Sequence, residues 1–159
     1  MLSGKTKKYK VDIKTYIRHG LEHVFRKWWW AFLVPIGIIL PGLYFTGALV
    51  WLILAAVLIT GLYILFWYIQ FYGLQQLPQG KMVFEKYSYE FDNNNLLVKL
   101  NQKEGMPIKY DQIQLVKKKS DALLIFISPI QFFYLPYSIF NSDADIKITE
   151  SILKRKNLL

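Results

Sequence analysis

Apolar and polar positions divide the chain into three regions with different periodicities. In residues 1–27, apolar and basic positions alternate weakly over KTKKYKV at 5–11, which predicts a short strand. Apolar side chains then recur at helical spacing from Ile13 to Trp28, polar and mostly basic side chains fill the opposite face, and Asp12 stands at the N-cap position. This pattern predicts an amphipathic helix that leads into the second region.

The second region carries no Asp, Glu, Lys, Arg or His between Lys27 and Lys81. About 20 apolar residues in a helix cross a bilayer core about 30 Å thick, so this run is too long for one span and suits two. The turn-forming sequence PGLYFTG at 41–47 lies near its middle. The pattern predicts a membrane hairpin with spans at about 28–44 and 48–72, within the region 28–72.

Short alternating runs separated by turn residues fill the third region, residues 81–159. Runs at 87–91 and 96–100 flank the turn cluster Asp92–Asn95 and predict a β-hairpin, and further apolar runs predict strands up to Pro136. Ser142 with Asp145 three residues later is typical of a helix N-terminus. The predicted fold class is a membrane α-helical hairpin plus a cytoplasmic α+β domain, in which a C-terminal helix closes a small antiparallel sheet or barrel. We expect the strand and helix of the first region to pack with this domain.

Charge and aromatic residues indicate how this arrangement meets the membrane. The formal net charge is +9, and residues 1–27 hold eight Lys or Arg against two acids. Basic residues flank both outer ends of the uncharged run whereas its central turn has none, so the positive-inside rule predicts a multi-pass cell-membrane protein with both termini in the cytoplasm. The expected interfacial aromatic anchors are Trp28, Trp29, Trp30, Trp67, Tyr68 and Tyr72.

Basic side chains near the spans are candidates for contact with anionic lipid headgroups of the bilayer. These candidates are Lys14, Arg18, Arg26, Lys27, Lys117, Lys118 and Lys119. The alternative for the three consecutive lysines is an ordinary solvated edge. The amphipathic helix likewise has two alternatives, to lie in the headgroup layer or to cover the cytoplasmic domain. No nucleic-acid-binding motif accompanies the basic charge, so nucleic acid is not an expected partner.

The motifs of enzymes are largely missing. The chain has no cysteine, phosphate-binding loop, nucleophile elbow or paired carboxylates on one face, so neither catalysis nor a cofactor is expected. The uncharged hairpin also lacks the intramembrane charges that usually mark transport paths. His19, Glu22 and His23 form an H-x-x-E-H sequence, in which both His could bind zinc and Glu22 act as general base. These are the only two His in the chain and no motif supplies a third ligand, so a metal hydrolase is the remote alternative.

The chain contains a strand, Asp and helix pattern at 8–25, a strand and hairpin pattern at 109–128, and a strand ending in Pro at 132–140. In this order the three segments resemble the YcxB-like family of bacterial membrane proteins. KYKVDIKTYIRHGLEHVF at 8–25 resembles the family's opening strand, Asp and helix, and KYDQIQLVKKKSDALLIFIS at 109–128 resembles its central strand and hairpin. FFYLPYSIF at 132–140 resembles its strand and Pro before a closing helix, although Tyr137 and Ser138 stand where members often have basic residues. The resemblance implies a pleckstrin-homology-like domain on a two-span anchor. It implies no activity, because the family has no assigned one.

Two functional hypotheses remain. The first is a membrane-anchored binding or regulatory module, whose cytoplasmic domain contacts a peptide, a protein or lipid headgroups at the inner membrane surface. The second is an accessory or structural subunit of a larger membrane complex, for instance a transporter, because two uncharged spans with aromatic ends can dock beside other helices. Neither hypothesis specifies the ligand, the protein partner or the oligomeric state.

Overall fold

A computed structural model describes residues 3–77, 80, 83–101 and 105–159. The chain forms two compact units. The first, here called the β-unit, combines Met1–Tyr16 with Leu74–Leu159, and the second, the hairpin unit, comprises Ile17–Gly73. Each unit is described in turn.

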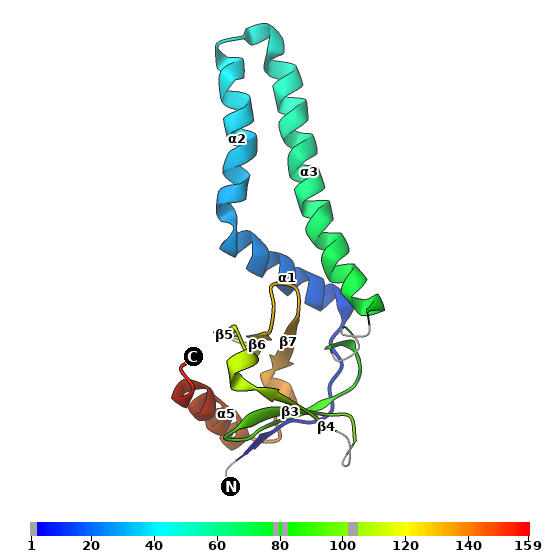
Figure 1. Ribbon diagram of the computed structural model, residues 1–159, viewed down its shortest axis with the longest axis vertical. Helices are drawn as coiled ribbons and strands as arrows, with labels where there is room; N and C mark the ends of the chain where they lie inside the picture. The colour runs from blue at the N-terminus through cyan, green and yellow to red at the C-terminus, as the bar shows by residue number, and fades with distance from the viewer. Residues whose placement is uncertain (1–2, 78–79, 81–82, 102–104) are drawn as a thin grey trace. The chain divides into compact units, whose positions relative to one another are not determined.

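The hairpin unit consists of helical segments joined by tight turns (Figure 1). The amphipathic helix α1 (Ile13–Lys27), whose residues 13–16 belong to the β-unit, begins as the sequence predicts, because the Asp12 carboxylate accepts hydrogen bonds from the Lys14 and Thr15 backbone N–H groups at 3.0 and 3.3 Å. Beyond a bend of 78° follow η1 (Trp29–Phe32), α2 (Leu33–Ile39), η2 (Leu40–Leu43), η3 (Thr46–Ala48) and α3 (Leu49–Gly73).

The first arm of the hairpin differs from the single helix expected over 28–44. It is α-helical only in α2 and takes the tighter 3₁₀ form before and after it. Pro35 falls in the first turn of α2, where its missing N–H costs no internal hydrogen bond. α2 packs against α3, and Gly42 allows a close approach at the turn, since a Cβ there would lie 2.8 Å from a methyl of Leu49. The pairing of two helical arms is therefore present, with a less regular first arm.

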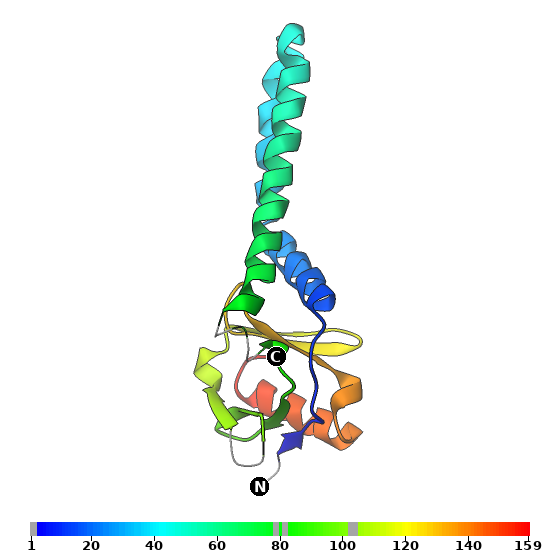
Figure 2. The same ribbon diagram turned by 90° about the vertical axis from the view of Figure 1, so that its right-hand side faces the viewer.

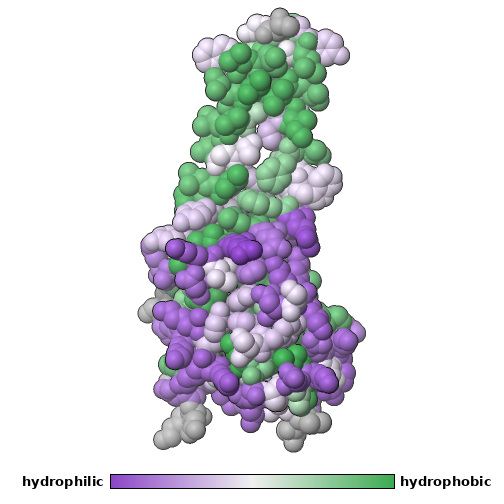
Figure 3. All heavy atoms as spheres, turned by 180° about the vertical axis from the view of Figure 1, so that it is seen from behind, coloured by the Kyte–Doolittle hydropathy of each residue, from purple (hydrophilic) through white to green (hydrophobic). Residues whose placement is uncertain are grey.

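The surface of the hairpin is apolar. Among the described residues, the helical segment Leu49–Gln76 is long and apolar enough to cross a membrane. The two helical segments Ile13–Lys27 and Trp29–Leu43, which meet at the 78° bend, reach the necessary length only if they are counted together as one span. Ala56 and Phe71 are the buried residues of α3, whereas Trp51 is 74% exposed. Figure 3 shows hydrophobic atoms over the visible face of this segment.

The β-unit contains two small antiparallel sheets. The first has the strand order β1 (Gly4–Lys5), β2 (Ser88–Phe91), β3 (Asn95–Lys99), β4 (Gly105–Lys109). The second consists of β5 (Leu115–Lys118), β6 (Ala122–Phe126) and β7 (Phe132–Pro136). The short helices η4 (Leu74–Gln76), η5 (Tyr110–Gln112) and η6 (Tyr137–Ile139) lie in the connections, and α5 (Asp143–Arg155) follows. The described strands thus give an α+β fold with two separate sheets and no closed barrel, which excludes the barrel alternative for this part of the chain.

The C-terminal helix α5 begins at the predicted N-cap. The Ser142 hydroxyl accepts a hydrogen bond from the Asp145 backbone N–H at 3.2 Å. α5 packs against β1, and Figure 2 shows the two elements side by side. Gly4 makes this contact possible, because a Cβ there would lie 2.1 Å from the Thr149 hydroxyl oxygen.

Tyr16 joins the start of α1 to the second sheet. Its side chain is fully buried, stacks on Phe132 with ring centroids 4.1 Å apart, and meets Phe84 edge-on at 4.8 Å. The hydroxyl donates to the Ile130 carbonyl at 2.5 Å and accepts from the Phe132 N–H at 3.1 Å. Burial raises the pKa of Tyr16 well above its ordinary value, so the phenol stays protonated and keeps both bonds.

Glu90 in β2 lies between two lysines on neighbouring strands. Lys99 of β3 donates to one carboxylate oxygen, and Lys5 Nζ of β1 lies 3.3 Å from the other. The hydrogen bond from Lys99, supported by Lys5 and opposed by burial, lowers the pKa of the Glu90 carboxyl. The ion pairs thus connect the three strands of this sheet.

Candidate functional site

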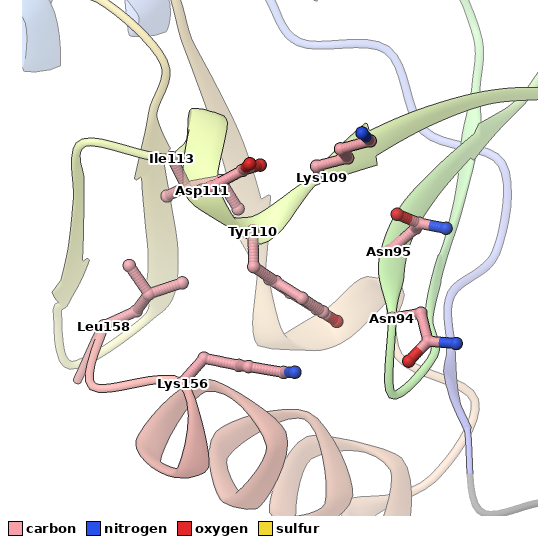
Figure 4. A pocket seen from close by; sticks show the side chains of 8 residues that line it. All are labelled: Asn94, Asn95, Lys109, Tyr110, Asp111, Ile113, Lys156 and Leu158. Carbon is pink, nitrogen blue, oxygen red and sulfur yellow. The ribbon is translucent and has the colours of Figure 1, made fainter.

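The β-unit contains an open pocket of about 610 Å³. Its walls come from three stretches that are distant in sequence: the turn before β3, the segment that leaves β4 through η5, and the end of α5 (Figure 4). The lining residues are Asn94, Asn95, Lys109, Tyr110, Asp111, Ile113, Lys156 and Leu158.

Tyr110 fixes one wall of the pocket to another. Its hydroxyl donates a 2.7 Å hydrogen bond to the Asp92 carbonyl in the β2–β3 turn. That turn is closed by the Asp92 N–H, which donates to the Asn95 carbonyl at 3.1 Å. Burial, and secondarily the charge of Asp92, raise the pKa of Tyr110 to about 12, although Arg155 opposes the shift. The phenol is therefore neutral at physiological pH and holds the asparagine turn in place.

The end of α5 supplies the third wall through a Schellman motif. The Leu158 N–H donates to the Leu153 carbonyl and the Asn157 N–H to the Lys154 carbonyl, both at 3.0 Å. Asn157 has a φ of 56°, the left-handed conformation that this motif needs at the residue after the cap. The chain therefore reverses after Lys156, and Leu158 returns to line the pocket.

Two cations of this last turn lie close to the asparagine turn. Lys156 Nζ lies 5.7 Å from the centroid of the Tyr110 ring, within the range of a cation–π contact. Arg155 Nη2 donates to Asn93 Oδ1 at 3.2 Å. Both line a smaller adjoining pocket of about 250 Å³, which shares Asn94 and Lys156 with the larger one. The two pockets together form one basic groove.

The groove offers binding chemistry. Three cationic side chains, Lys109, Arg155 and Lys156, and one carboxylate, Asp111, give its lining a net charge of +2. Asparagine amides add neutral donors and acceptors. Lysine, arginine and amide groups bind anions. From the sequence, Arg155 and Lys156 belong to the basic cluster Lys154–Lys156, for which contact with anionic headgroups and an ordinary helix end are the two alternatives. The asparagines are predicted as a turn, and the sequence does not indicate that they meet this cluster.

The H-x-x-E-H sequence lies on α1. His19 Nδ1 is 3.5 Å from Glu22 Oε2, and His23 is buried. Within the described ranges there is no group of three or more His, Cys, Asp or Glu side chains that could hold a metal ion. The described residues therefore add no third ligand to this motif.

The basic residues proposed to face lipid lie on two elements. Lys14, Arg18, Arg26 and Lys27 are exposed on α1. Lys118 in β5 is paired with Glu150 of α5, with Nζ and Oε1 2.7 Å apart, and that hydrogen bond raises the pKa of the lysine. Lys117 and Lys119 flank this pair. The α1 set therefore remains the better candidate for headgroup contact.

The proposed aromatic anchors behave in two ways within the hairpin unit. Trp28 stacks on Trp67 with centroids 5.0 Å apart, so these rings connect the start of the first arm to α3. Trp29 and Trp30 are 63% and 56% exposed. Tyr68 and Tyr72 stack on each other along α3, with centroids 6.2 Å apart. Trp29 and Trp30 are therefore accessible to the environment of the hairpin.

Comparison with known proteins gives one match. No curated protein and no solved structure matches the chain. Residues 91–148 match a protein-family model described as YcxB-like protein, and this segment runs from the last residue of β2 into α5. The match confirms, over these residues, the resemblance to the YcxB-like family that the sequence suggested.

Proposed function

We propose that this chain is an integral membrane protein that holds a small binding domain at the cytoplasmic surface of the cell membrane. The observation that carries the proposal is the hairpin unit, whose second helix is long and apolar enough to cross a bilayer. The domain is the β-unit with its basic groove.

The exposed apolar area of the hairpin supports the membrane assignment. Large apolar side chains such as Val57, Leu58 and Leu62 are 55–65% exposed along α3. Soluble proteins rarely expose contiguous apolar patches of more than a few hundred Å², because burying one such side chain is worth about 1.5–3 kcal/mol. A lipid environment removes this cost for every residue of the surface.

Charge supports a topology with both termini on the same side. Residues 1–27 are strongly basic, and the hairpin turn contains no ionisable Lys, Arg, Asp or Glu. Both ends of the β-unit's sequence would then stay in one compartment, as its composition from Met1–Tyr16 and Leu74–Leu159 requires. A binding role is favoured over catalysis because the groove offers cations and amides.

Single-cysteine labelling tests the proposal directly, because the natural chain contains no cysteine. We expect Lys8→Cys and Leu159→Cys to react with a membrane-impermeant maleimide only in inside-out vesicles. Gly47→Cys, in the hairpin turn, is expected to react in intact cells. Extraction of the protein by alkaline carbonate, or labelling of Gly47→Cys and Leu159→Cys from the same side, would contradict the proposal.

A further inference from the structure

We propose that the basic groove of the β-unit binds a phosphate group, carried either by a lipid headgroup or by a soluble phosphate compound. This inference rests on the proposed binding function and specifies its ligand class. It starts from the pocket of about 610 Å³ and its smaller neighbour, which share Asn94 and Lys156.

The first argument is that two lysines that form no ion pair with a described carboxylate line the same pocket. Lys5 and Lys99 are paired with Glu90, and Lys118 is paired with Glu150. Among the described residues, no carboxylate forms an ion pair with the two groove lysines, Lys109 and Lys156. The lining of the groove therefore carries a net positive charge, which attracts an anion.

The second argument is that the groove holds its donors in place. The Tyr110 hydroxyl bonds to the asparagine turn, and the Tyr110 ring lies beneath the Lys156 ammonium at 5.7 Å. The Schellman motif at Asn157 sets the direction in which Lys156 leaves the helix. Figure 4 shows the Lys156 side chain extended towards the space between Tyr110 and Asn94. A side chain held in this way loses less conformational entropy on binding than an unrestrained one.

The third argument is the match between these donors and phosphate. A phosphate dianion has several oxygens that point in different directions and accept charge-assisted hydrogen bonds. The groove supplies an ammonium from the end of α5, a second from the end of β4, and side-chain amides of Asn94 and Asn95, which can donate through nitrogen or accept through oxygen. Cationic groups from two different elements suit a ligand with several anionic oxygens. The one carboxylate of the lining, Asp111, is exposed to solvent as Lys109 and Lys156 are, and it leaves the groove with a net positive charge.

Protection of the lysines from chemical modification tests the inference on the full-length protein. The protein is placed in nanodiscs of phosphatidylcholine, and the acetylation rates of individual lysines are measured by mass spectrometry during titration with inorganic phosphate. A second series uses nanodiscs that contain phosphatidic acid. At a ligand concentration about ten times Kd, acetylation of Lys109 and Lys156 is expected to slow about tenfold, because only the unbound fraction reacts. Chloride at matched ionic strength controls for screening.

Two variants of α5 with the same charge change separate the groove from general electrostatics. Lys156→Gln is expected to abolish the phosphate protection of Lys109. Lys154→Gln, two residues earlier in the chain and in neither pocket, is expected to preserve that protection. The reciprocal variant Lys109→Gln is expected to remove the protection of Lys156. Equal loss in all three variants, or equal protection by chloride, would overturn the inference.

The two nanodisc series distinguish a soluble phosphate compound from a lipid headgroup as the source of the phosphate. Protection by inorganic phosphate in neutral nanodiscs assigns a soluble phosphate compound, and protection only with phosphatidic acid assigns a lipid headgroup. Absence of protection in both series refutes the phosphate site while leaving the membrane assignment intact. Failure of the protein to enter nanodiscs would instead refute the proposed function, and the phosphate titration can then be performed on the protein in solution.

Discussion

Replacing Tyr16 with phenylalanine would test how the second sheet of the β-unit is held to the N-terminal segment. The substitution keeps the ring that stacks on Phe132 and meets Phe84, and it removes only the hydroxyl oxygen. That oxygen donates to the Ile130 carbonyl and accepts from the Phe132 N–H. One atom therefore supplies two hydrogen bonds to the chain segment that enters β7.

The cost follows from what the substitution leaves behind. A typical intramolecular hydrogen bond contributes about 0.5–1.5 kcal/mol, whereas a buried polar group without a partner costs about 1–3 kcal/mol. Phe132 is fully buried, so water cannot easily replace the lost acceptor for its N–H. We therefore expect the local opening free energy of β7 to fall by about 1–3 kcal/mol, which is roughly a 5- to 150-fold increase in the opening equilibrium.

Hydrogen exchange of the full-length protein in nanodiscs measures this quantity, because exchange of protected amides reports local opening. The amide of Phe132 and its neighbours in β7 should exchange faster in Tyr16→Phe by the factor given above. Tyr87→Phe is the matched control, since that hydroxyl bonds to Glu85 at 3.0 Å in an exposed position. Equal exchange of β7 in the two variants would refute the assignment of a structural role to the buried hydroxyl.

Three further changes test other parts of the structure. The hydrogen bond from Lys99 lowers the pKa of Glu90, so the ionised carboxylate stabilises the fold above the ordinary pKa of 4.5 and loses this contribution as the pH falls through the folded-state pKa. In urea titrations, the difference in unfolding free energy between the natural protein and Glu90→Gln should therefore stay constant above about pH 4.5 and shrink below it. Asn157→Ala, at a φ of 56°, should lower the thermal stability of the β-unit by about 1 kcal/mol, whereas Asn157→Gly should not. Gly20→Ala would place a Cβ 2.5 Å from a buried phenylalanine ring of α3 and should destabilise the hairpin unit by about 1–3 kcal/mol. Gly61→Ala, whose Cβ would have nothing within 4 Å, should not. Unfolding of this unit can be followed by tryptophan fluorescence, since all five tryptophans lie between residues 28 and 67.

Features that depend on neighbouring residues were predictable from the sequence. The alternation around the asparagine turn gives the observed register, with Tyr89 opposite Val98 and Phe91 opposite Leu96, all buried. The apolar run at 123–127 lies mostly in β6, every residue of which is buried. Asp12 caps α1 because an N-cap needs only the two or three residues that follow it.

Features that depend on distant pairing were not predictable in the same way. Local alternation allows a closed barrel or two sheets equally, since closure depends on how the last strands pair with the first. β4 contains Pro107, which suits an edge strand, and its only strand partner in the described chain is β3. Apolar composition likewise does not distinguish an α-helix from 3₁₀ turns, so the irregular first arm of the hairpin could not be foreseen.

The groove shows the same limit at the level of the site. Asn94, Lys109 and Lys156 meet only after β3, β4 and α5 have taken their places, and each has an ordinary local explanation as turn, strand end or helix end. What sets Lys109 and Lys156 apart is that the fold brings both to one pocket beside the asparagine turn.

The two units of the chain offer different groups to a ligand. The two arms of the hairpin, from Trp28 to Gly73, contain no Lys, Arg, Asp or Glu, so the arms can select an apolar environment but offer little to distinguish one polar ligand from another. Specific recognition needs fixed charges and hydrogen-bond donors, and in the described β-unit these converge on the groove. Any selectivity of this protein for a small anionic ligand should therefore depend on Lys109, Lys156 and the asparagine turn, and should tolerate apolar exchanges on the outer face of the hairpin.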